Sequence, residues 1–221
     1  IDLLDEILDA QQGLMDRRAR ACDVYIGIPF CTTRCAYCSF SSGEIGDGRL
    51  VEPYLAALLH EIEACAEMAR EMGLHIRVGY IGGGTPSSLT TPQLDHLLAH
   101  VERHFGALAE FTVEAGRPDT LDAQKLRMLR DHPVTRISIN PQTMNDATLT
   151  RIGRAHTAKQ TVEAYELARS IGFDDINMDV IAALPGEDYA MFAHTLAEIR
   201  RLRPESLTVH TLAIKRSSRL H

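Results

Sequence analysis

The 221-residue sequence lacks tryptophan, long apolar runs and any excess of positive charge, and each absence excludes a class of protein. Aromatic residues make up 5% of the chain, and the formal net charge is −7 with acidic and basic residues interspersed. A broad basic surface for nucleic acid is therefore excluded. No apolar run approaches the roughly 18 residues of a membrane-spanning helix, and no signal-peptide pattern is present. We expect a cytoplasmic protein with no membrane span and no nucleic-acid partner.

Cysteine is also scarce, and its distribution is uneven. Of five cysteines, Cys31, Cys35 and Cys38 lie close together with the spacing C-x3-C-x2-C. An odd, clustered set is not a secreted disulfide framework, and it fits a reducing compartment and metal ligation. We expect Cys65 to be a core residue on the apolar face of a helix. Cys22 precedes a predicted strand, at the end opposite the three clustered thiols.

Three thiols without a fourth predict a metal centre with one open position. A structural zinc site usually has four protein ligands, and it is the alternative to be weighed. A cubane iron–sulfur cluster held by three thiolates leaves one iron free for a non-protein ligand. We favour the iron–sulfur interpretation.

The hydrophobic pattern predicts an alternation of strands and helices. Strands are predicted at 24–28, 77–81, 110–114, 135–140, 175–180 and 206–213, and helices at 51–72, 91–105, 120–130, 145–152, 157–171 and after 186 to about 203. Thr91 and Pro92 are the expected N-cap and first residue of the second helix, and Cys65 lies within the first. This alternation predicts βαβ units, a parallel sheet and an α/β fold. No Gly-x-Gly-x-x-Gly opens the first helix, so we predict a partial (β/α)6 TIM-like barrel.

The predicted domain division is simple. Residues 1–21 form a charged helical lead-in, and residues 22–221 form one core domain. Because the chain begins at Ile1 without an initiator methionine, we expect a fragment of a longer polypeptide.

Unusual polar and glycine residues follow the predicted strands. In chain order they are the three clustered cysteines, Gly82-Gly83-Gly84-Thr85-Pro86, Glu114, Asn140, Gln142, Asp179, His210 and Thr211. In a barrel of parallel strands, the chemistry lies on loops at the carboxyl ends of the strands. We therefore expect these residues to meet on one rim. Asp179 lies in an apolar strand, where an unpaired acid is costly, so it needs a partner or a role.

The C-x3-C-x2-C loop, with Tyr37 just before the last cysteine, resembles the radical S-adenosylmethionine (radical SAM) superfamily, and so does the Gly-Gly-Gly-Thr-Pro loop. The resemblance implies that Cys31, Cys35 and Cys38 hold a catalytic [4Fe-4S] cluster, and that SAM chelates its open iron. An electron from an external donor then cleaves SAM to a 5′-deoxyadenosyl radical. A plain iron–sulfur electron carrier is disfavoured, because a carrier needs no SAM-binding loop.

Further segments resemble the oxygen-independent coproporphyrinogen III oxidase group, and its HemZ (coproporphyrinogen dehydrogenase) branch in particular. They are Tyr25-x-x-Ile-Pro-Phe-Cys, Arg136-Ile-Ser-Ile-Asn-Pro-Gln142, Ile152-Gly-Arg-x-His156 and Ile176-Asn-Met-Asp-x-Ile-x-x-Leu-Pro-Gly186. By this resemblance, the residues around cluster-bound SAM are Tyr25, Tyr37, Gly83, Glu114 and Ala213. Positions that line a second SAM site in the group are Gly84, Thr85, Gln142, Arg154 and Asp179.

The substrate implied by the resemblance is a tetrapyrrole. We expect oxidative decarboxylation of coproporphyrinogen III to protoporphyrinogen IX in haem biosynthesis. One departure matters, because Phe40 stands where the oxidase branch has another cysteine, which the haem-chaperone branch also lacks. The alternatives are a haem-binding chaperone, with His156 and His210 as candidate axial ligands, or radical SAM chemistry on another tetrapyrrole.

Overall fold

The computed structural model of the chain describes residues 5–6, 9 and 20–221. The predicted lead-in helix over residues 1–21 therefore lies almost entirely outside the described residues. From residue 21 onward, strands and helices alternate along the chain.

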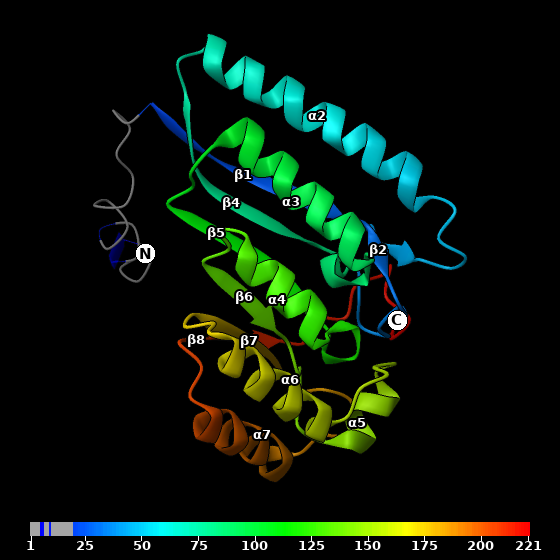
Figure 1. Cartoon of the computed structure of the whole chain (residues 1–221). Coiled ribbons are helices and arrows are strands. Elements are labelled where there is room, and N and C mark those ends of the chain that lie inside the picture. The colour runs from blue at the N-terminus through cyan, green and yellow to red at the C-terminus, as the bar shows by residue number, and fades with distance from the viewer. Residues whose placement is uncertain (1–4, 7–8, 10–19) are drawn as a thin grey trace.

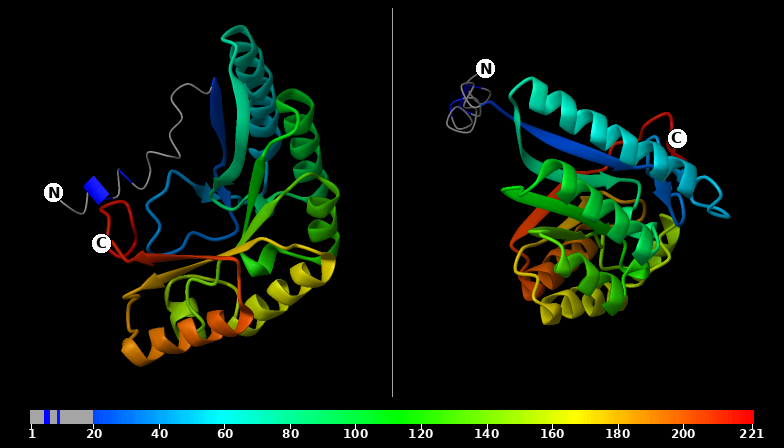
Figure 2. Two further views of the ribbon diagram at one scale, coloured as in Figure 1. Left: turned by 90° about the vertical axis from the view of Figure 1, so that its left-hand side faces the viewer. Right: turned by 45° about the horizontal axis from the view of Figure 1, so that its top comes forward.

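A six-stranded parallel sheet forms the centre of the molecule, in the order β1-β4-β5-β6-β7-β8. The strands are β1 (Ala21–Ile28), β4 (His75–Gly83), β5 (Glu110–Gly116), β6 (Arg136–Ile139), β7 (Ile176–Ala182) and β8 (Ser206–Thr211). The sheet curls so that its convex face carries the helices, while the segment after β1 lies on the concave side (Figure 2). This half-barrel confirms the predicted fold.

In the described residues, six α-helices lie between the strands, and Figure 1 shows their arrangement. They are α2 (Val51–Glu71), α3 (Thr91–Phe105), α4 (Ala123–Asp131), α5 (Asp146–Arg151), α6 (Ala158–Ile171) and α7 (Tyr189–Leu202). None of the helices in the described part of the chain is both long and apolar enough to cross a membrane.

Helix capping explains where three of the predicted boundaries hold or fail. Thr157 caps α6 and Gly172 ends it in a left-handed conformation, both as predicted. The N-cap of α3, however, is Thr90 rather than the predicted Thr91. The Thr90 hydroxyl accepts a hydrogen bond from the Gln93 backbone, and the Gln93 side chain accepts one from the Thr90 backbone. This reciprocal capping box outweighs the pattern of a threonine just before proline.

Other boundaries shift for local reasons. The helix predicted at 120–130 begins later, at Ala123, because Asp122 caps it and Pro118–Thr120 form a 3-10 turn. The glycine-containing connection at 43–48 holds a short strand, β3 (Gly43–Glu44), which pairs with β2 (Phe30–Cys31).

The main core lies between the convex face of the sheet and the helices. Its fully buried members include Leu94 and Leu98 of α3, with Ile81, Val113 and Ile137 of the strands. Burial of one such side chain stabilises the fold by about 1.5–3 kcal/mol. Leu94 and Leu98 lie one helical turn apart, which places both on this buried face.

The prediction for Cys65 was wrong. Cys65 is exposed on α2, because Ile62, Ala66 and Ala69 occupy the face that packs on the core. Cys22 lies near the start of β1, at the end of the strand opposite the clustered thiols, as expected.

Candidate active site

The predicted site residues meet at one rim of the half-barrel. A cavity of about 440 Å³ opens beside the carboxyl ends of the strands. Of the predicted site residues, those that line it are Cys31, Cys35, Cys38, Tyr37, Gly83, Gly84, Thr85, Glu114, Gln142, Arg154, Asp179 and Ala213. Tyr25 lines a second cavity of about 300 Å³, to which Gly83 and Gly84 also contribute.

The cysteine loop, residues 29–42, is fixed at its base by the small β2–β3 ladder. The amide of Gly43 donates to the Pro29 carbonyl at 2.9 Å, and that of Ile45 donates to the Cys31 carbonyl at 2.8 Å. At the tip, the Cys38 amide donates to the Cys35 carbonyl at 3.1 Å. These backbone bonds place the three thiols on one short turn.

The connection between α5 and α6 accepts hydrogen bonds from the far side of the cysteine loop. The Ala36 amide donates to the Ile152 carbonyl at 2.9 Å, and the Thr33 hydroxyl donates to the Gly153 carbonyl at 3.0 Å. Gly153 has φ +77°, and a Cβ there would lie 3.4 Å from the Arg34 carbonyl oxygen. The space would admit a Cβ, so it is the left-handed backbone conformation that favours glycine at this position.

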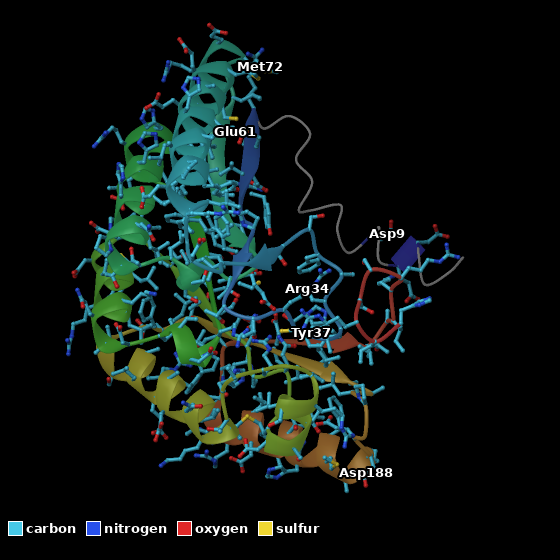
Figure 3. The ribbon with its side chains drawn as sticks, turned by 90° about the vertical axis from the view of Figure 1, so that its right-hand side faces the viewer. Asp9, Arg34, Tyr37, Glu61, Met72 and Asp188 are labelled. Carbon is cyan, nitrogen blue, oxygen red and sulfur yellow. The ribbon has the colours of Figure 1, made fainter. Side chains whose placement is uncertain are left out.

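Arg154 extends this contact to the side chains. Its Nη2 donates to the Tyr37 hydroxyl at 3.1 Å, and its guanidinium interacts electrostatically with Cys35. Burial raises the pKa of Tyr37, so this phenol stays neutral. Figure 3 shows Tyr37 and Arg34 on the concave side of the sheet, where the loop lies. A fixed positive charge thus lies beside the thiols.

The glycine loop after β4 runs against the start of the cysteine loop. The Gly84 amide donates to the Ile28 carbonyl and the Thr85 amide to the Phe30 carbonyl, both at 2.7 Å. A Cβ on Gly84 would lie 2.6 Å from the Phe30 oxygen and 2.9 Å from the Cys31 sulfur. Only glycine allows the two loops to lie this close.

Glu114 and Tyr80 together form another part of the cavity wall. The Tyr80 hydroxyl donates to Glu114 Oε1 at 2.6 Å, and the Tyr80 ring stacks on Tyr25 with centroids 5.7 Å apart. Burial raises the pKa of Glu114, and the hydrogen bond from Tyr80 partly opposes that rise. The carboxylate is therefore held on the cavity wall at an electrostatic cost that a cationic or hydroxyl-bearing ligand would offset.

Gln142 follows the end of β6, and Asp179 lies in the middle of β7. Gln142 has φ +67°, is buried, and its side-chain oxygen has no hydrogen-bond partner. Asp179 accepts a hydrogen bond from Asn177 at 2.7 Å and lies 3.9 Å from His210. The partner expected for Asp179 is therefore Asn177. The unpaired buried amide oxygen of Gln142 indicates a position built for a ligand.

The two histidines considered as axial ligands differ. His210 lines the cavity and is half exposed. His156 has a fully buried side chain, 3.6 Å from Asp119. Although burial raises the pKa of Asp119, His156 and Arg117 hold it below its usual range. Because His156 is buried beside Asp119 and does not line the cavity, it is not placed as an axial ligand to haem there.

Comparison with known proteins now identifies the family. The profile of the Radical SAM superfamily matches residues 25–199. The chain belongs to the radical SAM superfamily. Over its full length, this radical SAM chain is 44% identical to the oxygen-independent coproporphyrinogen-III oxidase-like protein HemZ of Bacillus subtilis. Over 86% of its length, it is 37% identical to the haem chaperone HemW of the same organism.

A solved structure agrees with these sequence relatives. Coproporphyrinogen III oxidase (HemN) from Escherichia coli superposes with a TM-score of 0.80 and 28% identity, covering 92% of this chain. The chain covers 45% of HemZ, 50% of HemW and 47% of the HemN structure. It thus spans about half the length of these relatives.

The described residues fit the cofactors that the radical SAM superfamily implies. Three thiols face one cavity, and the other two cysteines lie outside it, so the donor set is three sulfurs. A Cβ added at Gly83 would lie 2.9 Å from the Ile28 carbonyl oxygen, so at this position the cavity wall is formed by backbone rather than by a side chain. The unpaired oxygens of Gln142 and Asn140 add acceptors for a polar ligand.

Sequence reasoning missed several cavity residues. They are Thr33, Arg34, Tyr80, Arg117 and Asn177. Tyr80 of β4 is the register partner of Tyr25 of β1. Because side chains alternate between the two faces of a sheet, this pairing could have placed Tyr80 on the same face as Tyr25. Arg117 is the first residue after β5. The rule that functional residues lie on the loops after the strands could therefore have identified it as well.

Proposed function

We propose that this chain holds a [4Fe-4S] cluster on Cys31, Cys35 and Cys38 and binds SAM beside the cluster. The reaction we propose for it is the oxidative decarboxylation of coproporphyrinogen III to protoporphyrinogen IX. The observation that carries the proposal is that the three thiols, the glycine loop and Glu114 line one cavity. The similarity to HemZ of Bacillus subtilis and to HemN of Escherichia coli supports the tetrapyrrole substrate.

When bound and reduced by an external donor, the cluster and SAM would supply the radical chemistry that removes a hydrogen atom from a propionate, and loss of CO₂ and of one electron to an external acceptor would complete the vinyl group. The chain itself binds and orients. Gly83 presents backbone to SAM, and the Glu114 carboxylate accepts hydrogen bonds from its ribose or ammonium group. Ala213, which lines the same cavity, and Tyr25, which lines the second cavity together with Gly83, complete this set.

A second group of residues is proposed to orient a further ligand in the same cavity. Thr85, Gln142 and Asp179 offer a hydroxyl, an amide and a carboxylate. Arg154 is already bonded to Tyr37, and we propose that it stabilises the thiolates as well as binding a second SAM. Gly84 provides the close contact between the two loops.

A haem-binding chaperone is the second candidate function. Phe40 is 67% exposed at the mouth of the cavity, where an aromatic ring can stack on a flat macrocycle. His210 is the histidine placed to ligate haem iron. The relationship to HemW supports this candidate.

Two paired assays test these functions. With a reductant under anaerobic conditions, the protein should cleave SAM to 5′-deoxyadenosine, and Cys35→Ala should abolish cleavage. Conversion of coproporphyrinogen III to protoporphyrinogen IX would support the oxidase, whereas stoichiometric haem binding that His210→Ala weakens, without conversion, would support the chaperone. If reduced, cluster-loaded protein leaves SAM intact, the radical SAM activity is contradicted.

A further inference from the structure

A second cluster of metal-binding side chains lies on the convex side, between α2 and α3. These helices pack side by side over the sheet (Figure 1). Glu63 of α2 faces His100 and His104 of α3, and one donor atom from each lies within 4.8 Å of the other two. None of the three residues lines the cavity beside the cysteine loop.

The spacing of the donor atoms suits a small metal ion. His100 Nε2 lies 3.5 Å and His104 Nε2 lies 3.8 Å from Glu63 Oε1. Metal–nitrogen and metal–oxygen bonds of about 2.0–2.2 Å in a tetrahedral site place neighbouring donors about 3.3–3.6 Å apart. Small side-chain rotations would therefore bring all three donors onto one ion.

The helical register brings the two histidines together. His100 and His104 are separated by one turn of α3, and their ring centroids lie 4.3 Å apart. Two imidazoles four residues apart on one helix face are a recurrent way to hold a transition metal. Glu63 supplies a third ligand, from the other helix, and its negative charge.

His100 is the buried member of this group. Its Nε2 lies 3.0 Å from the Leu59 carbonyl oxygen. That carbonyl, inside α2, also accepts the helical hydrogen bond of Glu63. Metal binding at Nε2 requires the tautomer that carries the ring proton on Nδ1, and the Leu59 carbonyl then keeps its hydrogen bond from the Glu63 amide.

We propose that Glu63, His100 and His104 form a binding site for a divalent transition metal ion of the zinc type, which joins α2 to α3. Imidazole nitrogens with one carboxylate suit Zn²⁺ and its neighbours better than Ca²⁺ or Mg²⁺. His60, whose Nδ1 lies 3.9 Å from Glu63 Oε2, is within reach of the fourth position. Arg103 is the nearby cation that opposes binding, since it also lowers the pKa of His100.

The test uses the cluster-loaded protein, prepared anaerobically and incubated with Zn²⁺ before desalting. We expect about one zinc to remain per chain, with the iron content unchanged and only nitrogen and oxygen neighbours in the zinc X-ray absorption spectrum. His104→Asn and Glu63→Gln should each weaken zinc binding by at least about tenfold. His194→Asn, at an exposed histidine on α7, is the matched control and should bind zinc normally.

Thermal unfolding gives an independent readout. Zn²⁺ should raise the melting temperature of the unaltered protein and of His194→Asn, but not of His104→Asn or Glu63→Gln. Sulfur neighbours around zinc would assign the metal to cysteine and overturn the proposal. Equal retention by all variants, or no retention at all, would also overturn it and leave a hydrogen-bonded helix pair only.

Discussion

At the scale of single residues, glycine decides how close the thiols come to the ligand-binding wall. Gly84 has two polar neighbours, the Phe30 oxygen and the Cys31 sulfur, within 3 Å of the place where a Cβ would lie. Real Cβ atoms do not occupy such positions, so the contact specifies glycine. Gly43, near the other end of the cysteine loop, has no atom within 4 Å of that place.

We therefore predict that Gly84→Ala displaces the Cys31 thiol and lowers the iron and sulfide bound after reconstitution. The steric cost should be about 1–3 kcal/mol. Gly43→Ala is the matched control and should load a full cluster. Equal iron content in the two variants would contradict this account of the loop contact.

Glu114 combines a binding role with a cost to stability. Burial raises its pKa above the ordinary value of 4.5. A carboxyl group whose folded pKa is raised stabilises the fold while protonated, and that contribution is lost as pH rises through the folded pKa. At neutral pH the ionised Glu114 therefore lowers the free energy of unfolding.

We predict that Glu114→Gln binds SAM more weakly yet folds more stably. A hydrogen bond to a charged group contributes about 1.5–3 kcal/mol, so affinity should fall about 10- to 150-fold. In urea titrations, the stability gain over the unaltered protein should grow from pH ~4 to pH ~7. A gain that is constant with pH would show that Glu114 ionisation is not its cause.

At the scale of elements, the connection between α5 and α6 determines the environment of the cluster. It reaches the cysteine loop through Ile152, Gly153 and Arg154, and a small apolar group that includes Leu149 and Ile181 packs beneath Tyr37. The charge of Arg154 lies next to Cys35. Positive charge near an iron–sulfur cluster favours its reduced form.

Arg154→Gln should therefore shift the cluster potential to more negative values, by tens of millivolts (about 30 mV or more). The potential is measured by electron paramagnetic resonance during a redox titration. Arg151→Gln is the control, because Arg151 donates to the Pro185 carbonyl on the exposed side of α5. If both variants keep the original potential, Arg154 does not tune the cluster.

At the scale of the whole molecule, the sequence predicted the half-barrel and the rim, because strand period and turn chemistry are local signals. It could not predict that Cys65 would be exposed, since α2 carries apolar residues on more than one side. Nor could it pair Tyr80 with Glu114, or His100 with Glu63. Those contacts join different βα units and depend on how the sheet curls.

The sheet also keeps an ion-paired group, Arg136 with Glu110 and Asp175, apart from the cavity residues. At the amino ends of the strands, Arg136 bonds Glu110 at 2.9 Å and Asp175 at 3.0 Å, far along the strands from the cavity residues. We predict that Arg136→Met lowers the free energy of unfolding by about 1 kcal/mol, because these pairs are partly exposed. Cluster content and SAM cleavage should not change. Loss of cluster in this variant would show that the two edges are coupled.

That separation has a consequence for how such a protein can adapt. Because the six strands of the sheet run in the same direction, their carboxyl ends hold the reactive groups. Their amino ends hold Arg136 with its two carboxylates. Tolerance to heat or salt can therefore change through substitutions at the amino ends while the chemistry stays constant. At the carboxyl ends, by contrast, a group such as Glu114 couples stability to ligand binding, so a change there alters both properties.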